Sequence, residues 1–116
     1  MARAVAKLKN LSVSARKVRL VADMIRGKKV ADARDILQFT LKVSAEPIGK
    51  LLASAVANAE SKASEQHDRI DTDEMVVSEI MVNEGRTLRR FQNAARGRAM
   101  PIRNRSSHVE LTISDS

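Results

Sequence analysis

The sequence lacks cysteine, tryptophan and tyrosine, and it has only two phenylalanines among 116 residues. Without cysteine the chain can form no disulfide and offers no thiolate for catalysis or metal binding, which fits a reducing compartment. With so few aromatic rings the core is expected to be aliphatic and rich in alanine. The same shortage argues against the aromatic platforms on which many single-strand binders stack nucleobases.

Long apolar stretches are also absent. No run approaches the roughly 20 residues that span a membrane, and the basic segment 1–17 lacks the apolar centre of a secretory signal. The 43% hydrophobic content is ordinary for a folded protein. At this length we expect one domain over residues 1–116, in the cytoplasm and without membrane contact.

The net charge of +7 is unevenly distributed along the chain. Residues 1–42 contain eleven Lys/Arg and three acids, whereas residues 43–85 contain three Lys/Arg and nine acids. Residues 86–105 contain seven arginines and no acid. A charge excess that served solubility alone would be spread evenly, so this pattern predicts one face devoted to nucleic acid.

The pattern of apolar residues predicts an α+β fold, with three helices packed on a small antiparallel sheet and one long extended β-hairpin arm. An edge strand is expected over residues 3–9. Two further strands are expected over 75–82, which is β-branched and apolar, and over 108–114, which alternates cleanly. The arm, residues 86–105, lies between these two strands and extends their hairpin.

Three helices are expected before the second strand. The first begins at Ser12 or Ser14 and stops at Gly27. The third, about 16–20 residues long, begins at Ser44 and is followed by a polar linker over 61–74. The expected buried side of the second helix is Val30, Ala33, Leu37 and Leu41.

The arm has too little apolar surface to order itself. Its larger apolar residues are Leu88, Phe91, Met100 and Ile102, each worth about 1.5–3 kcal/mol if fully buried. Ordering some twenty residues costs on the order of 20–40 kcal/mol in backbone entropy. Because guanidinium groups bind phosphate through a planar fork, we expect a polyanionic partner to order the arm.

A second cationic set lies in the first third of the chain. Arg16 and Lys17 stand near an expected helix start, where positive charge is unfavourable for the helix dipole, so a compensating anion is indicated. We predict nucleic-acid contacts for this set, which comprises Lys7, Lys9, Ser14, Arg16, Lys17, Arg19, Lys28 and Lys29.

Two rival functions stay open on the residues alone. Helices around Gly27 resemble a helix-turn-helix, so the chain could be a DNA-binding regulator that uses the 14–41 helix pair and the basic arm. Against this, Asp32 and Asp35 would repel DNA phosphates. A small RNA-processing nuclease would need His67 or His108, for which we expect structural or capping roles. We therefore expect no enzyme, no catalytic or metal-binding residue and no cofactor.

Four segments carry a family resemblance: SARKVRLVADMIRGKKVADARDIL, KLLASAVANAE, SEIMVNEG and RRF…ARGRAMPIRNRSSHVELTI. Together they resemble the bacterial large-subunit ribosomal protein family numbered twenty-two, in the family's order over residues 3–114. The resemblance implies an α+β globule on the outer face of the large ribosomal subunit. It also implies a hairpin that threads through ribosomal RNA to the wall of the polypeptide exit tunnel.

The partners implied by the resemblance are large-subunit ribosomal RNA, neighbouring large-subunit proteins and, at the hairpin tip, the nascent polypeptide. At Gln92–Ala94 and at Asn104 the sequence is less basic than the family pattern, so no phosphate contact is assigned there. The resemblance implies RNA contacts along the arm and at its tip for Arg86, Arg89, Arg90, Arg96, Gly97, Arg98, Arg103 and Arg105.

Overall fold

The computed structural model describes residues 3–66, 71–85, 88–93 and 99–115. These residues form five strands, three α-helices and one short 3₁₀ helix. In chain order the elements are β1 (Arg3–Leu11), α1 (Ala15–Ile25), α2 (Val30–Phe39), α3 (Ala45–Glu65), η1 (Thr72–Glu74), β2 (Val76–Glu84), β3 (Leu88–Asn93), β4 (Ala99–Asn104) and β5 (Ser107–Ser114).

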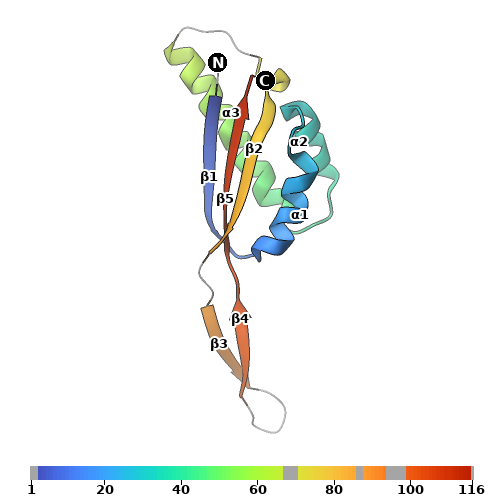
Figure 1. Ribbon diagram of the computed structural model, residues 1–116, viewed down its shortest axis with the longest axis vertical. Helices are drawn as coiled ribbons and strands as arrows, with labels where there is room; N and C mark the ends of the chain where they lie inside the picture. The colour runs from blue at the N-terminus through green and yellow to red at the C-terminus, as the bar shows by residue number, and fades with distance from the viewer. Residues whose placement is uncertain (1–2, 67–70, 86–87, 94–98, 116) are drawn as a thin grey trace.

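The main sheet has three antiparallel strands in the order β1-β5-β2, so the last strand of the chain lies in the centre (Figure 1). The prediction of an edge strand at the N-terminus is confirmed. Alternate residues of the three strands face the helices: Ala6, Leu111 and Ile80 share one row across the sheet and all three are buried. The period of two predicted for the 108–114 segment is confirmed by burial of Val109, Leu111 and Ile113.

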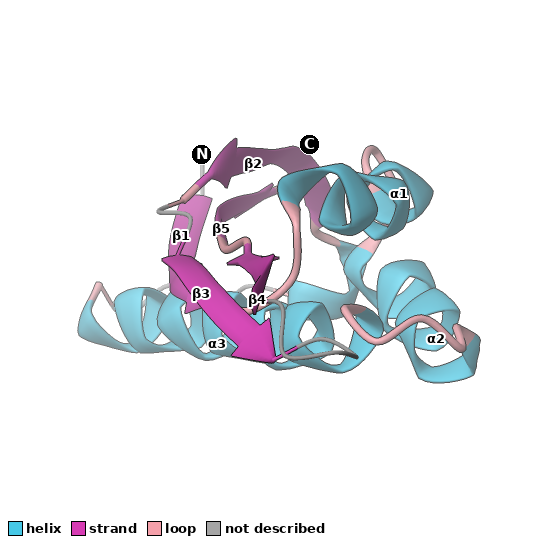
Figure 2. Ribbon diagram, turned by 90° about the horizontal axis from the view of Figure 1, so that it is seen from below, coloured by secondary structure: helices cyan, strands magenta, loops and turns pink. Residues whose placement is uncertain are grey.

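The helices cover one face of this sheet. Figure 2 shows α3 lying along the β1 side and α1 along the β2 side, while α2 packs against the other two helices. The core is aliphatic, as the shortage of aromatic residues predicts. Its largest fully buried side chains are Ile25, Ile48, Leu52, Met75, Leu111 and Ile113. The prediction of three helices on a small antiparallel sheet is therefore confirmed.

The boundaries of the helices differ from expectation in two places. Leu41 was expected on the buried side of α2, but the helix ends at Phe39 and Leu41 is 102% exposed. Thr40 ends the helix: its backbone turns extended and its hydroxyl donates to the Ile36 carbonyl at 2.6 Å. In the other place, α3 is 21 residues long and takes in residues 61–65 of the expected linker, because buried Ala63 continues its apolar stripe.

The predicted helix ends are otherwise confirmed. Ser14 and Ser44 occupy the N-cap positions of α1 and α3, although neither side chain makes a capping hydrogen bond. Gly27 follows α1 with a φ of 78°, a left-handed conformation that glycine adopts at little cost.

Both outer edges of the sheet are covered by side chains from the helices. On the β1 edge, the Asn58 amide donates to the Val5 carbonyl at 3.0 Å and the Lys62 ammonium donates to the Arg3 carbonyl at 3.3 Å. On the β2 edge, Arg19 of α1 and Arg26, the residue after α1, donate to the carbonyls of Val82 and Ile80. Exposed strand edges invite pairing with other chains, so these contacts protect the globule from edge-to-edge association.

The arm is a separate two-stranded antiparallel pair, β3 with β4. It extends away from the end of the globule opposite to the chain ends (Figure 1). Pro101 pairs with Phe91 in this ribbon, where each strand is an edge strand and can accept a proline. The radius of gyration is 17.5 Å, against about 13 Å for a compact chain of this length, which reflects the projecting arm.

Candidate nucleic-acid interface

The seven globular cations predicted to bind nucleic acid are all exposed, and Ser14 is half-buried. Five of them lie near the two ends of α1, which are about 16 Å apart for a helix of this length. Of the other two, Lys7 lies on β1 opposite Glu110, and Arg19 lies within α1. One group lies at the neck, the end of the sheet from which the arm leaves. The other lies at the far end of the sheet, near the chain ends (Figure 1).

The neck group consists of Lys9 near the end of β1, and Arg16 and Lys17 in the first turn of α1. β1 reaches the neck where Leu11 pairs with Ser107, the first residue of β5. The first turn of α1 contains no acidic residue. Because the N-terminal end of a helix is itself partly positive, this turn concentrates positive potential beside the base of the arm.

The far group consists of Lys28 and Lys29 in the turn between α1 and α2. This turn is fixed to β2, since the Val77 backbone N–H donates to the Lys28 carbonyl and the Gly27 N–H donates to the Val77 carbonyl, each at 2.9 Å. The Lys29 ammonium lies 3.2 Å from a Glu74 carboxylate oxygen. Lys29 therefore already has a protein anion as a partner, and these two lysines lie apart from the neck group.

Arg19 is engaged by the protein rather than free. Its Nε and Nη2 atoms donate to the Val82 carbonyl at 3.3 and 3.0 Å, and this carbonyl lies on the open edge of β2. Arg26, seven residues further on and at the C-cap of α1, donates to the Ile80 carbonyl at 2.9 Å and also pairs with Asp23. Arg19 is not among the buried residues of α1, and no local pattern in the sequence signals that a strand edge lies beside it.

The arm brings its described arginines into register at the backbone. Arg89 is directly opposite Arg103, and Arg90 is opposite Ile102. Arg105 is exposed at the base of the arm, next to β5. The predicted contact residues Arg86, Arg96, Gly97 and Arg98 lie outside the described residues.

Three strands meet at the neck around His108. The imidazole Nδ1 of His108 accepts a hydrogen bond of 3.0 Å from the backbone N–H of Asn10, 98 residues earlier in the chain. Asn10 has a φ of 59°, and the β1–β5 register shifts between Leu8 and Leu11. The structural role expected for His108 is thus observed, whereas the other histidine, His67, lies outside the described residues.

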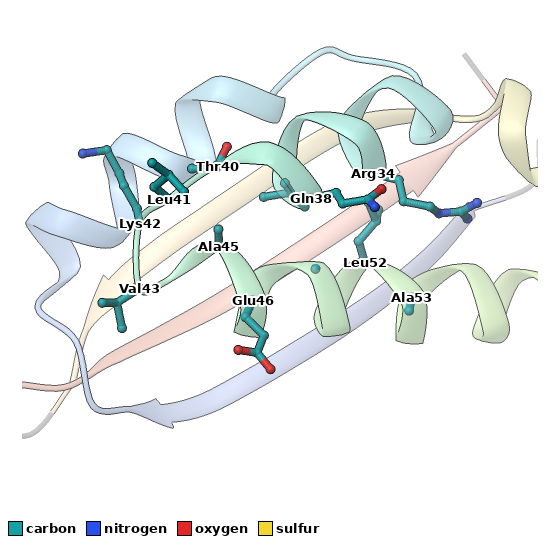
Figure 3. A pocket seen from close by; sticks show the side chains of 12 residues that line it. Arg34, Gln38, Thr40, Leu41, Lys42, Val43, Ala45, Glu46, Leu52 and Ala53 are labelled. Atoms are coloured by element: carbon teal, nitrogen blue, oxygen red, sulfur yellow. The ribbon is translucent and has the colours of Figure 1, made fainter.

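A groove between α2 and α3 has a different character (Figure 3). Its volume is about 740 Å³, and its lining includes Leu37, Leu52 and the exposed Leu41 and Val43. Charges of both signs surround it, from Arg34 and Lys42 to Glu46. An apolar floor with mixed charges around it is unlike a phosphate-binding surface, so we leave this groove out of the nucleic-acid interface.

The features required by the rival functions are not found in the described part of the chain. Over residues 3–66, 71–85, 88–93 and 99–115, no three His, Asp or Glu side chains gather as a metal site would require. No described helix has the length and hydropathy needed to cross a bilayer. Asp32 and Asp35 are exposed on α2, where a DNA-recognition helix would meet phosphate.

The comparisons with known proteins all indicate the same family. The sequence profile of the family described as "Ribosomal protein L22p/L17e" matches residues 6–114. The chain is 45% identical over 110 residues to the "Large ribosomal subunit protein uL22" of Pediococcus pentosaceus, covering 95% of this chain and 89% of that protein. It is 49% and 50% identical to the proteins of the same name from two strains of Desulfitobacterium hafniense, each over 113 residues that span 97% of this chain and 95% of the relative.

Proposed function

The chain belongs to the family of ribosomal proteins L22p/L17e, and from that membership we propose that it is a structural component of the large ribosomal subunit that binds ribosomal RNA. It works in the cytoplasm, beside neighbouring large-subunit proteins, and carries out no catalysis. The observation that carries the proposal is the family match, which runs through both the globule and the arm. Residues 1–116 act as one domain, whose arm is the extended RNA-binding hairpin.

The arm has the more specific role. On this proposal it passes inward between segments of ribosomal RNA, and the tip around Arg96–Arg98 forms part of the wall of the polypeptide exit tunnel. The nascent chain then passes the tip. The antiparallel pairing of β3 with β4 supports this role, because an extended ribbon advances about 3.3 Å per residue and reaches far for its mass.

The RNA contacts fall into three groups. Arginines along the arm bind backbone phosphates, the neck group binds RNA at the base of the arm, and the Lys28–Lys29 turn binds at the far end of the globule. Exposure of the globular cations supports this assignment. Arg19 has the weakest support, because its guanidinium already binds the Val82 carbonyl.

Release of counterions supplies much of the binding free energy on this mechanism. If all seven arginines of residues 86–105 met phosphates, log K would fall against log salt concentration with a slope of about −5 to −6. A slope near zero for the cognate ribosomal RNA would contradict the mechanism. A monomer that prefers structured RNA to duplex DNA is expected, whereas a DNA-binding regulator would dimerise on specific duplex sites.

Co-sedimentation with ribosomes tests the proposed function directly. An epitope tag at the N-terminus lies far from the arm (Figure 1), so the tagged chain can be followed through subunit separation. We expect it in the large-subunit peak after a moderate salt wash, and absent from the small-subunit peak. A matched chain in which five arm arginines (89, 90, 96, 98 and 103) are replaced by glutamine serves as the control, and it is expected to wash off at lower salt. Recovery of the parent chain only in ribosome-free fractions would refute the proposal.

A further inference from the structure

The neck is the only part of the described structure through which the globule can determine where the arm points. The β2–β5 ladder closes there with the pair Glu84–Ser107 and with a hydrogen bond of 2.9 Å from the Gly85 N–H to the Ser106 carbonyl. Beyond this point β3 and β4 contact each other, with no extensive contact to any described element of the globule. The direction of the arm is therefore set over a few residues.

Apolar packing thins out at these residues, where Leu11, opposite Ser107, is only partly buried against the core. The last buried apolar pair across β2 and β5 is Val82 with Val109. Ser107 is also buried, but its hydroxyl makes no hydrogen bond within the described part of the chain. The neck therefore depends more on polar contacts and steric fit than the middle of the sheet does.

His108 makes the polar contact that joins the third strand to the neck. Because its Nδ1 accepts the hydrogen bond from Asn10, that nitrogen carries no proton, and the ring proton of the neutral imidazole is on Nε2. The accepted N–H belongs to a residue with positive φ at the irregular end of β1. This bond secures the end of β1 to the strand that continues into the arm.

Gly85 shows how closely the same ring is packed from the other side. A Cβ atom on Gly85 would lie 2.6 Å from the Ser106 hydroxyl and 3.1 Å from the His108 Nε2. The first distance is shorter than side chains approach and the second is tight, so a side chain here would displace the Ser106 hydroxyl and press on the ring. The imidazole thus sits between β1 and the start of the arm.

We propose that His108 is a positioning residue for the arm: its neutral imidazole, held between Asn10 and Gly85, fixes the direction in which the arm leaves the globule. This inference rests on the proposed function, because it supposes that the globule and the arm bind one ribosomal RNA together. Two linked binding modules reinforce each other only when their geometry lets both engage at once. Loosening the neck therefore weakens RNA binding without removing a phosphate contact.

A thermodynamic cycle in the full-length chain tests this role. His108→Leu removes the acceptor, whereas His108→Asn keeps a side-chain oxygen near the Nδ1 position. Each is made in the parent chain and in the arm-neutral chain, which is the control chain carrying glutamine at Arg89, Arg90, Arg96, Arg98 and Arg103. Affinity for large-subunit ribosomal RNA transcribed in vitro is measured, and urea unfolding checks that every variant is folded.

We expect His108→Leu to lower affinity about tenfold in the parent chain and less than about twofold in the arm-neutral chain. His108→Asn should stay within about twofold of the parent. Equal losses in both chains would overturn the proposal, because they would mean that His108 acts on the globule alone. Absence of loss, or equal losses for the leucine and asparagine variants, would overturn it too.

Gly85→Ala provides a second route if His108→Leu does not fold. Its added methyl group clashes with the Ser106 hydroxyl and presses on the imidazole without removing the ring, so the same loss confined to the parent chain is expected. A loss that is equal in both chains would again overturn the inference. The proposed function fails separately, since it requires the unsubstituted parent chain to bind ribosomal RNA before any variant is compared.

Discussion

The globule and the arm are built on opposite principles. The globule buries an aliphatic core between one sheet face and three helices, and helix side chains cover both outer edges of its sheet. The arm is two short strands paired with each other and with no third layer. Because an isolated two-stranded hairpin is marginal in water, we expect the arm to depend on its partner for stability, whereas the globule has a core of its own.

The comparison also shows two uses of arginine in one chain. In the globule, Arg19 and Arg26 donate to carbonyls of β2 and so complete the protein's own hydrogen bonding. In the arm, arginine is the only charged residue type from Arg86 to Arg105, and no acid is available to pair with it. In the globule, arginine side chains therefore bond to the protein's own backbone. In the arm, they have no acid of the same segment to pair with and are available to bind phosphate.

Removing the arm is the change with the largest expected effect. Leu88 and Asn104 are opposite each other in register, so residues 89–103 can be replaced by an Asn-Gly turn. Five arginines are lost; at about 1 kcal/mol per phosphate contact, RNA affinity falls by roughly 10³-fold or more. The salt slope becomes less steep by about 3.5–4.5. Filter binding over a salt series measures both quantities.

The same deletion should leave the globule intact, with a thermal midpoint within about 2 °C of the parent's, because no core residue is removed. Circular dichroism during heating checks this. Loss of cooperative unfolding would show that the arm and the globule are one folding unit, and the contrast drawn above would fail.

Leu52 and Leu41 both line the groove between α2 and α3, and comparing their substitutions tests whether buried side chains supply the globule's stability. Leu52 is 1% exposed, and Leu52→Ala is expected to cost about 2–5 kcal/mol through lost burial and the cavity left behind. Leu41 is fully exposed in the same groove lining, so Leu41→Ala should change the free energy of unfolding by less than about 0.5 kcal/mol. Urea unfolding measures both. Comparable costs would mean that the 40–44 segment packs differently from the structure.

Arginines on α1 give the smallest and most selective effect. Arg19→Gln breaks the contact with the Val82 carbonyl, so it should lower stability by about 1 kcal/mol and leave the salt slope of RNA binding unchanged. Arg16→Gln, the matched control at the neck, should leave stability within about 0.5 kcal/mol and make the slope less steep by about 0.7–0.9. The reverse pattern would assign Arg19 to RNA and Arg16 to the fold.

Much of the fold could be predicted because it follows local periodicity. The apolar repeat of α1, the alternation of β5 and the glycine that stops α1 are each visible within a few residues. The errors arose at helix ends, because apolar spacing along the chain does not show which residue stops a helix. Leu41 continues the helical spacing but lies past the residue that ends α2, and residues 61–65 look like a linker until the packing of Ala63 is known.

The candidate nucleic-acid interface also has a part that the sequence predicts, its chemistry, and a part that it does not, its geometry. Its chemistry was readable from the sequence, because a run of arginines without acids specifies a polyanionic partner wherever it is placed. Its geometry was not, because the separation of Lys28–Lys29 from the neck depends on how α1 lies against β2. The hydrogen bond between His108 and Asn10 joins residues at opposite ends of the sequence and leaves no local pattern.

Residue types and their short-range spacing are enough to predict the composition of the core, most of the elements that form and the charge of the arm. Which exposed arginines bond to the protein's own carbonyls depends on how distant segments pack. Only the tertiary structure brought β1, β2 and β5 together at the neck. Strand edges and the ends of a strand ladder form only after distant segments have paired. The sequence therefore does not show which side chains will contact them.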